Sequence, residues 1–149
     1  MTCTFDTNIL VYTLPAPTNT KRNQARDLLI RGARPQAGIL LLQSLMEFSH
    51  VAARKFGLSI NSIRRRVRDW RDAIPVHAAG EEDLMAALNL VRDHRIGFWD
   101  ALLCATADRA GLRYLLSEDM QDGMRLGGLR IVNPFRPENT ALIDRILPQ

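Results

Sequence analysis

The opening stretch of the chain constrains its fold more than any other feature. Positions 4–11 have the sequence TFDTNILV, a short apolar lead-in that ends in a single acidic residue. This pattern predicts a buried strand that stops at Asp6 and turns directly into a helix. An aspartate at the carboxyl end of such a strand lies at the mouth of an open α/β sheet, where these folds bind ligands. Asp6 is therefore either part of a ligand site or only the N-cap of the helix, a position that aspartate favours.

Apolar runs that predict strands alternate along the chain with longer stretches that predict helices. After the opening strand we expect strands at 39–42, 73–77, 114–116 and 129–132, and helices at 9–14, 18–32, 44–57, 60–71, 81–94, 98–111 and 141–147. The alternation predicts an α/β fold with a mainly parallel sheet, in a single domain spanning residues 1–149.

Some elements carry more detailed expectations. Pro75 favours an edge position for the strand at 73–77, because proline cannot donate a ladder hydrogen bond. Thr18 or Asn19 is the expected cap of the second helix. Within the helix at 81–94, Leu84 and Leu88, continued by Val91, are spaced as a core-facing stripe. Met46 contributes in the same way to the apolar side of the helix at 44–57.

The composition is ordinary for a globular protein. Of the 149 residues, 46% are hydrophobic, and the longest apolar runs fall far short of the ~20 residues that span a bilayer. The first residues do not resemble a secretory signal, so we expect a cytoplasmic protein with no membrane segment. Cys3 and Cys104 lie in apolar stretches and are expected to be core residues, with no disulfide between them.

The net charge of +4 comes from a basic side that is almost entirely arginine, with only two lysines, Lys21 and Lys55. Arginine makes bidentate contacts to phosphate, which suits a nucleic-acid partner and equally an acidic protein. The densest basic segment is the helix at 60–71, where Arg64, Arg65 and Arg68 are candidate RNA contacts. A solvated face with no partner remains an alternative interpretation of the same residues.

Four acidic residues lie where a predicted element begins or ends, beside apolar neighbours. They are Asp6, Glu47, Asp100 and Asp119, with Asp122 as a weaker fifth position. Carboxylates that come close together raise each other's pKa. A divalent cation such as Mg²⁺ or Mn²⁺ relieves that repulsion and prefers oxygen ligands. A metal site is therefore predicted if the fold brings these residues together.

Each of these later acidic residues also has a purely structural interpretation. Ser44 and Glu47 have the spacing of a capping box, in which Glu47 would only satisfy backbone donors. Asp100 lies in the first turn of a predicted helix, where the helix dipole favours a negative charge. Asp119 and Asp122 precede a glycine and belong to a residue type common in turns.

Taken in order, the acidic motifs resemble those of PIN-domain nucleases. The sequence FDTNIL at 5–10 resembles the first motif of the family, and Glu47 after the second predicted strand resembles the second. The sequences FWDAL at 98–102 and LSEDMQDG at 116–123 resemble the third and fourth. Ser117 stands where many members have threonine and keeps the hydroxyl group. The length is similar to that of VapC-type toxins of bacterial toxin–antitoxin pairs.

The resemblance implies a three-layer α/β/α sandwich with a five-stranded parallel sheet, and cleavage of RNA that depends on Mg²⁺ or Mn²⁺. It also implies a small antitoxin partner and a homodimer. No catalytic role falls to the three histidines. The residues that it implicates are Asp6, Glu47, Asp100 and Asp119 as metal ligands, Asp122 as a further ligand, and Asn8 and Ser117 as supports that hold the carboxylates in place.

Two other classes of protein are compatible with an acidic pocket on an α/β fold. A receiver-type domain usually has paired acidic residues after its first strand and a lysine after its last. Here only Asp6 follows the first strand, neither lysine lies near the end of the chain, and no P-loop-type glycine motif occurs. The other alternative is a non-catalytic PIN-like module that binds protein or RNA, against which the intact carboxylate set argues.

Overall fold

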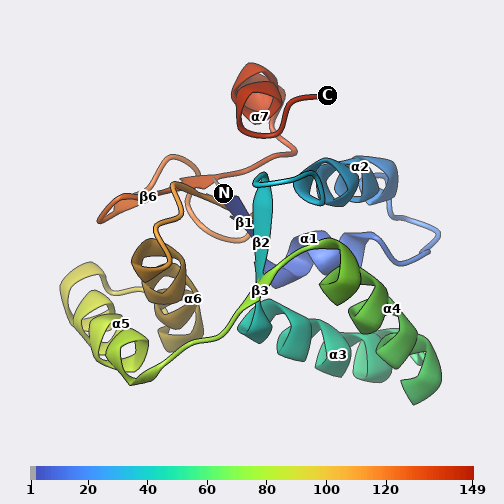
Figure 1. The fold of residues 1–149 in the computed structure, drawn as a ribbon, viewed down its shortest axis with the longest axis horizontal. Coiled ribbons are helices and arrows are strands. Elements are labelled where there is room, and N and C mark those ends of the chain that lie inside the picture. The colour runs from blue at the N-terminus through green and yellow to red at the C-terminus, as the bar shows by residue number, and fades with distance from the viewer. Residues whose placement is uncertain (1–2) are drawn as a thin grey trace.

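The first strand of the chain lies at the centre of the sheet. The computed structural model describes residues 3–149 (Figure 1). In this part of the chain the strands are β1 (Cys3–Phe5), β2 (Gly38–Leu41), β3 (Val76–His77), β4 (Tyr114–Leu116), β5 (Arg125–Leu126) and β6 (Leu129–Val132). Their spatial order is β3-β2-β1-β4-β6-β5, and all neighbours are parallel except β5 and β6. The predicted α/β class with a mainly parallel sheet is therefore confirmed.

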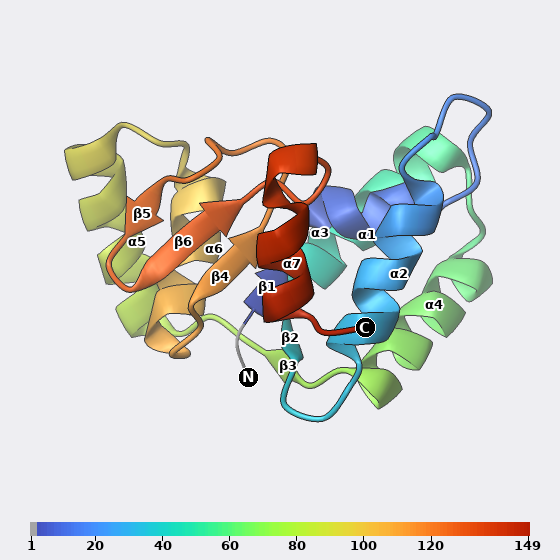
Figure 2. The same cartoon turned by 90° about the horizontal axis from the view of Figure 1, so that it is seen from above.

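Helices enclose the sheet from both sides and make the three predicted layers. They are α1 (Thr7–Tyr12), α2 (Arg22–Gly32), α3 (Leu42–Phe56), α4 (Ile60–Ala73), α5 (Glu81–His94), α6 (Phe98–Arg109) and α7 (Thr140–Ile146), which follows a 3₁₀ turn at Pro137–Asn139. Helices α5 and α6 lie on one side, and the other five lie on the opposite side (Figure 1 and Figure 2). Within residues 3–149, no helix is both long and apolar enough to cross a membrane.

The central strands are largely apolar because both of their faces are covered. Successive residues of a strand point to opposite faces. Leu115 packs in the cluster on the α6 side, whereas its neighbour Leu116 packs with Phe5 in the other cluster. Leu40 and Leu41 divide between the two clusters in the same way. This accounts for the absence of polar alternation in the predicted strands.

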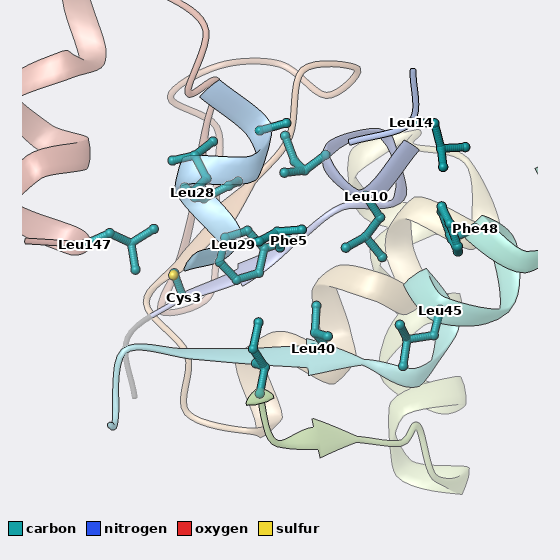
Figure 3. Close-up of a cluster of buried hydrophobic side chains, with 14 of the residues drawn as sticks. Cys3, Phe5, Leu10, Leu14, Leu28, Leu29, Leu40, Leu45, Phe48 and Leu147 are labelled. Carbon is teal, nitrogen blue, oxygen red and sulfur yellow. The ribbon is translucent and has the colours of Figure 1, made fainter. Parts of the chain in front are cut away.

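Phe5 occupies the middle of the larger cluster, between helix α2 and strand β2. Figure 3 shows its ring beside Leu29, with Leu28 and Leu40 nearby and Leu10 following from α1. The last residue of α2 is a glycine, and a Cβ atom there would lie 2.4 Å from the Phe5 ring. The ring is fully buried and has no room to move aside, so the close approach of α2 requires glycine.

The sheet has one strand more than the five that were predicted. Strand β5 is only two residues long and pairs antiparallel with β6 through a tight turn in which Gly127 has a φ of +59°. A two-residue segment shows no alternation of apolar and polar positions, so the sequence carried no signal for it. Strand β3 lies at the edge of the sheet, as Pro75 indicated.

The buried face of α5 differs from the predicted stripe. Leu84 and Leu88 are 42% and 48% exposed, while Asp83 and Ala87 are buried. Only Val91 of the stripe packs towards α6, where the buried centre of the contact consists of alanines. Asp83 accepts a 3.0 Å hydrogen bond from Arg109 of that helix. Close packing through alanines displaces the larger leucines to the side, which leaves them facing solvent.

The predicted cap of α2 is also wrong. Helix α2 begins at Arg22, and its N-cap residue, Lys21, makes no capping side-chain hydrogen bond. Asn19 instead donates to the carbonyl oxygens of Tyr12 and Leu14, at 2.6 and 3.0 Å. Its side-chain oxygen also accepts the backbone N–H of Lys21 at 3.2 Å, so Asn19 links the end of the preceding helix to the residue before α2 without occupying the N-cap position.

Candidate metal centre

The order of the strands creates a crevice at the carboxyl end of β1. This strand has β2 on one side and β4 on the other, so the connections on its two sides run in opposite directions. Ligands bind open α/β sheets at such a switch point, outside the carboxyl ends of the strands. Asp6 follows β1 directly, and Ser117 follows β4 directly. The topology therefore brings the first and fourth acidic motifs together.

A pocket of about 320 Å³ opens at this crevice. The four predicted carboxylates, Asp6, Glu47, Asp100 and Asp119, all line it. They come from four separate segments: the residue after β1, helix α3, helix α6 and the loop after β4. The remaining lining residues are Thr7, Asn8, Val11, Tyr12, Val51 and Lys55.

Asp6 is the most deeply placed of the four, with only 7% of its surface exposed. One carboxylate oxygen accepts the backbone N–H of Thr7 at 2.6 Å, which caps α1. The other accepts the hydroxyl of Ser117 at 2.6 Å and faces the side-chain amide of Asn8 at 3.4 Å. The two interpretations of Asp6 are thus compatible, since the same side chain caps the helix and lines the pocket.

The carboxylates of the pocket influence one another electrostatically. Burial raises the pKa of Asp6 to about 6, against the lowering effect of the hydrogen bonds from Ser117 and Thr7, and the charges of Asp100 and Asp119 add to the rise. The pKa of Asp100 is also raised, first by burial and then by the charges of Glu47 and Asp119. The pocket thus concentrates negative charge, which a cation would relieve.

Glu47 is held in the pocket by two hydrogen bonds. Its Oε2 atom accepts the hydroxyl of Thr7 at 2.9 Å, and its Oε1 atom accepts the amide of Gln43 at 2.7 Å. The capping-box interpretation is wrong, because Ser44 donates to the carbonyl of Phe5 at 2.9 Å and the N-cap position of α3 is Leu41. Neither supporting residue was identified from the sequence, although Gln43 lies one helical turn before Glu47.

The oxygen donors are of the type that Mg²⁺ and Mn²⁺ prefer. Asn8 adds a buried side-chain oxygen that has no hydrogen-bond partner among residues 3–149, so an acceptor is available beside Asp6. The same part of the chain holds no group of three acidic, histidine or cysteine residues already arranged as a metal cage. The donor set fits a divalent cation in its chemistry, and side-chain rotation is needed to close it around one.

Asp122 is not part of this pocket. Its Oδ1 atom accepts the backbone N–H of Asn133 at 2.8 Å and the amide of Asn139 at 2.9 Å. These bonds tie the loop after β4 to the segment after β6. The suggestion that Asp122 is a fifth ligand therefore needs correction, since its place in the structure fits its alternative interpretation as a loop residue.

The predicted arginine residues lie apart from the carboxylates. Arg64, Arg65 and Arg68 are exposed on α4 and do not line the pocket. Helix α4 packs against α3 through the rings of Phe48 and Trp70, whose centroids are 4.7 Å apart. Among the described residues that line the pocket, the one basic side chain is Lys55, which no motif in the sequence marks as part of a site.

A second polar cluster borders the pocket at Tyr12. The hydroxyl of Tyr12 donates to Glu118, and Lys21 forms an ion pair with the same carboxylate. The Lys21 amino group lies 5.1 Å from the centre of the Tyr12 ring. This cluster joins α1 to the loop after β4 and so supports the wall of the pocket. Its members are too far apart in the sequence for any local pattern to reveal it.

The cysteines lie in the core, as predicted. Cys3 and Cys104 are free and fully buried, and burial raises the pKa of each thiol to about 12. Both thiols therefore stay protonated at neutral pH and are poor metal ligands.

Comparison with known proteins agrees with this architecture. The family model of the PIN domain matches residues 3–121. No curated protein matches the chain significantly in sequence. Among solved structures the chain is similar to a toxin–antitoxin complex from Klebsiella pneumoniae, with 23% identity and a TM-score of 0.67, over 91% of this chain and 99% of that one.

Two further structures resemble it at lower identity. VapC20 of Mycobacterium tuberculosis, a toxin that cleaves the sarcin-ricin loop, is 15% identical with a TM-score of 0.67, over 87% of this chain and 99% of its own. VapBC2 from Rickettsia felis, in a structure with a DNA fragment from its promoter, is 15% identical with a TM-score of 0.65. The match covers 88% of this chain and 97% of that one. These similarities establish the shared fold.

The raised pKa of Asp6 predicts a specific dependence of stability on pH. The folded state holds the proton more tightly than the unfolded state, so the free energy of unfolding falls as the pH rises from about 4 to above 6. The full effect of a shift of this size is about 3 kcal/mol. Asp6→Asn removes this contribution, so the stability of the variant relative to the wild type should increase across that interval in denaturant titrations with EDTA.

Asp69→Asn, at an exposed position on α4, is the matched control and should follow the wild type. If the difference between Asp6→Asn and the wild type stays constant from pH 4 to pH 7, burial does not disfavour the charge on Asp6.

Proposed function

The chain belongs to the PIN-domain family, and from this premise we propose that it is a metal-dependent endoribonuclease and the toxin of a toxin–antitoxin pair. The observation that carries the proposal is the pocket at the carboxyl end of β1, lined by Asp6, Glu47, Asp100 and Asp119. A pocket of this charge repels a phosphodiester group on its own. It suits RNA cleavage once a divalent cation balances the carboxylates.

In this proposal, Asp6, Glu47, Asp100 and Asp119 hold Mg²⁺ or Mn²⁺, directly or through water, and Asn8 offers a further oxygen. A cation bound there lowers the pKa of a water molecule and neutralises charge on the phosphate. Ser117 orients Asp6 through its hydroxyl group. Thr7 and Gln43 orient Glu47 in the same way. Such supporting hydrogen bonds are what a metal site requires to keep its ligands in position.

Lys55 has a separate role in the proposal. It lies on α3 two turns beyond Glu47, which corresponds to roughly 12 Å along the helix. The amino group is suited to contact a backbone phosphate of the RNA beyond the cleavage position, because lysine binds phosphate as a point charge.

The choice of RNA and of a toxin role is supported by similarity. The structure from Klebsiella pneumoniae is a toxin–antitoxin complex, and VapC20 cleaves the sarcin-ricin loop, which is an RNA target. By analogy, we propose that this chain cleaves an accessible single-stranded loop of a folded RNA, where bases and backbone are exposed. Its protein partner would be a small antitoxin.

We also propose a homodimer, and α5 offers the surface. Leu84, Met85 and Leu88 are 42%, 61% and 48% exposed on this one helix. A row of large apolar side chains facing solvent is typical of a surface that another protein covers.

Removal of a ligand should abolish cleavage. Loss of a residue that only supports a metal ligand typically lowers metal affinity or activity about 10- to 100-fold. Asp6→Asn or Asp100→Asn, which changes a ligand itself, should therefore lower RNA cleavage by at least about 100-fold. Cleavage should be assayed with Mg²⁺, with Mn²⁺ and with EDTA, and the fold followed by circular dichroism. Asp69→Asn should remain fully active.

Full activity in either variant would remove that residue from the mechanism. If the wild type fails to cleave RNA both with Mg²⁺ and with Mn²⁺, the chain is instead a non-catalytic member of its fold.

The basic residues are tested by the salt dependence of RNA binding. On single-stranded RNA, each phosphate contact contributes about 0.7 to the slope of log K against log salt. In an Asp100→Asn background, Lys55→Ala should lower this slope by about 0.7. The triple variant Arg64→Ala, Arg65→Ala and Arg68→Ala should lower it by up to about 2 if all three contact RNA. An unchanged slope in the triple variant excludes α4 from the RNA-binding surface.

The dimer is tested by sedimentation. Leu84→Glu combined with Leu88→Glu should convert a dimer to a monomer, because each change places a charge where the dimer interface would bury an apolar side chain. Ile60→Glu is the control, since Ile60 is 74% exposed on α4, away from this surface. A double variant that stays dimeric would place the interface elsewhere.

A further inference from the structure

A second pocket adjoins the carboxylate pocket and has a different character. Its volume is about 430 Å³, and its lining residues are Gln43, Met46, Glu47, His50, Val51 and Trp99. Glu47 and Val51 line both pockets, so the two are continuous along α3. Met46 and Trp99 are 61% and 63% exposed, which contradicts the expectation that Met46 faces the core.

Trp99 is held in position although most of its ring is exposed. Its carbonyl oxygen accepts the amide of Gln43 at 2.9 Å, and Gln43 also binds Glu47. The ring packs edge-on with Phe98, with centroids 5.1 Å apart and an angle of 71° between the planes. The next residue in the chain is Asp100 of the carboxylate pocket. One short segment therefore presents an exposed indole and a carboxylate side by side.

We propose that this apolar pocket receives the base of a nucleotide next to the scissile phosphate, stacked on Trp99. This inference rests on the proposed ribonuclease function. A base is joined through its ribose to the phosphate that the carboxylate pocket would hold, so it must lie within one nucleotide of that pocket. None of the described residues lining the apolar pocket is lysine or arginine, so it does not suit a second phosphate.

The lining also explains what such a pocket would select. Stacking on an indole tolerates any base, because every base has a π-face. Met46 and Val51 supply apolar contacts, and His50 supplies a polar group that can distinguish base edges. The pocket therefore contributes affinity at one nucleotide position, with a preference set by its polar residues. A protein segment that occupies the same surface is the competing outcome.

The first experiment removes the indole of Trp99 and the RNA base separately. Trp99→Ala, Trp99→Phe and the control Ile60→Ala are assayed on a single-stranded RNA that the wild type cleaves. The same RNA is also prepared with one base deleted, in turn, at each position flanking the cut. Stacking of this kind is worth about 1–3 kcal/mol, so Trp99→Ala should lower kcat/KM at least about fivefold on intact RNA. At one abasic position the loss should disappear, and Trp99→Phe should retain most of the activity.

Equal losses on intact and abasic RNA, at every position, would overturn the proposal, because Trp99 would then act on the carboxylate site or on folding. No loss at all would overturn it as well. A Trp99→Ala variant that cleaves normally but no longer forms a dimer would assign this surface to a second copy of the chain.

A second readout does not depend on cleavage. In an Asp100→Asn background with Mg²⁺, an intact oligonucleotide should quench the fluorescence of Trp99, its abasic counterpart should quench less, and an added Trp99→Phe change should abolish this difference. Base-dependent quenching in this background, together with a wild type that cleaves no RNA, would retain the base pocket and reject the nuclease function. A wild type that cleaves RNA, with no base-dependent quenching of Trp99, would retain the nuclease function and reject the base pocket.

Discussion

The structure depends most on one buried carboxylate. Asp6 ends the central strand, caps the first helix and accepts the hydroxyl of Ser117 from the neighbouring strand. Burial of this group opposes its ionisation and raises its pKa to about 6. At neutral pH an ionised Asp6 therefore lowers the stability of the fold, and hydrogen bonds offset only part of the effect. A group that costs stability at the mouth of a sheet is characteristic of a functional site.

The remaining parts of the site are arranged around that carboxylate by the topology. The chain reverses its direction of winding at β1, so loops from opposite sides of the sheet meet there. Glu47 is held by Thr7 from the first motif and by Gln43 from its own helix. Gln43 also binds the backbone of Trp99, which links the carboxylate pocket to the adjoining apolar pocket. The proposed metal site and the proposed base pocket therefore share a single hydrogen-bonded framework.

Much of this could be predicted from the sequence, because strands buried on both faces leave continuous apolar runs and their acidic ends are conspicuous. What could not be predicted depends on contacts between distant segments. The stripe at Leu84 was assigned to the core, since helical spacing cannot tell whether leucines or alanines make the closer contact. Ser44 has the spacing of a capping box, but its hydroxyl donates to the carbonyl of Phe5, a contact that local sequence does not reveal. Asp122 was included as a ligand because no local signal points to Asn139.

The central claim is that separate segments of the chain supply one cation site at the carboxyl end of β1. A crystal grown with Mn²⁺ and measured for anomalous scattering tests it most directly. We expect a peak within about 2.5 Å of oxygens from at least two of the four carboxylates, with the others bound through water. Crystals at saturating Mn²⁺ with no anomalous peak among Asp6, Glu47, Asp100 and Asp119 would contradict the account.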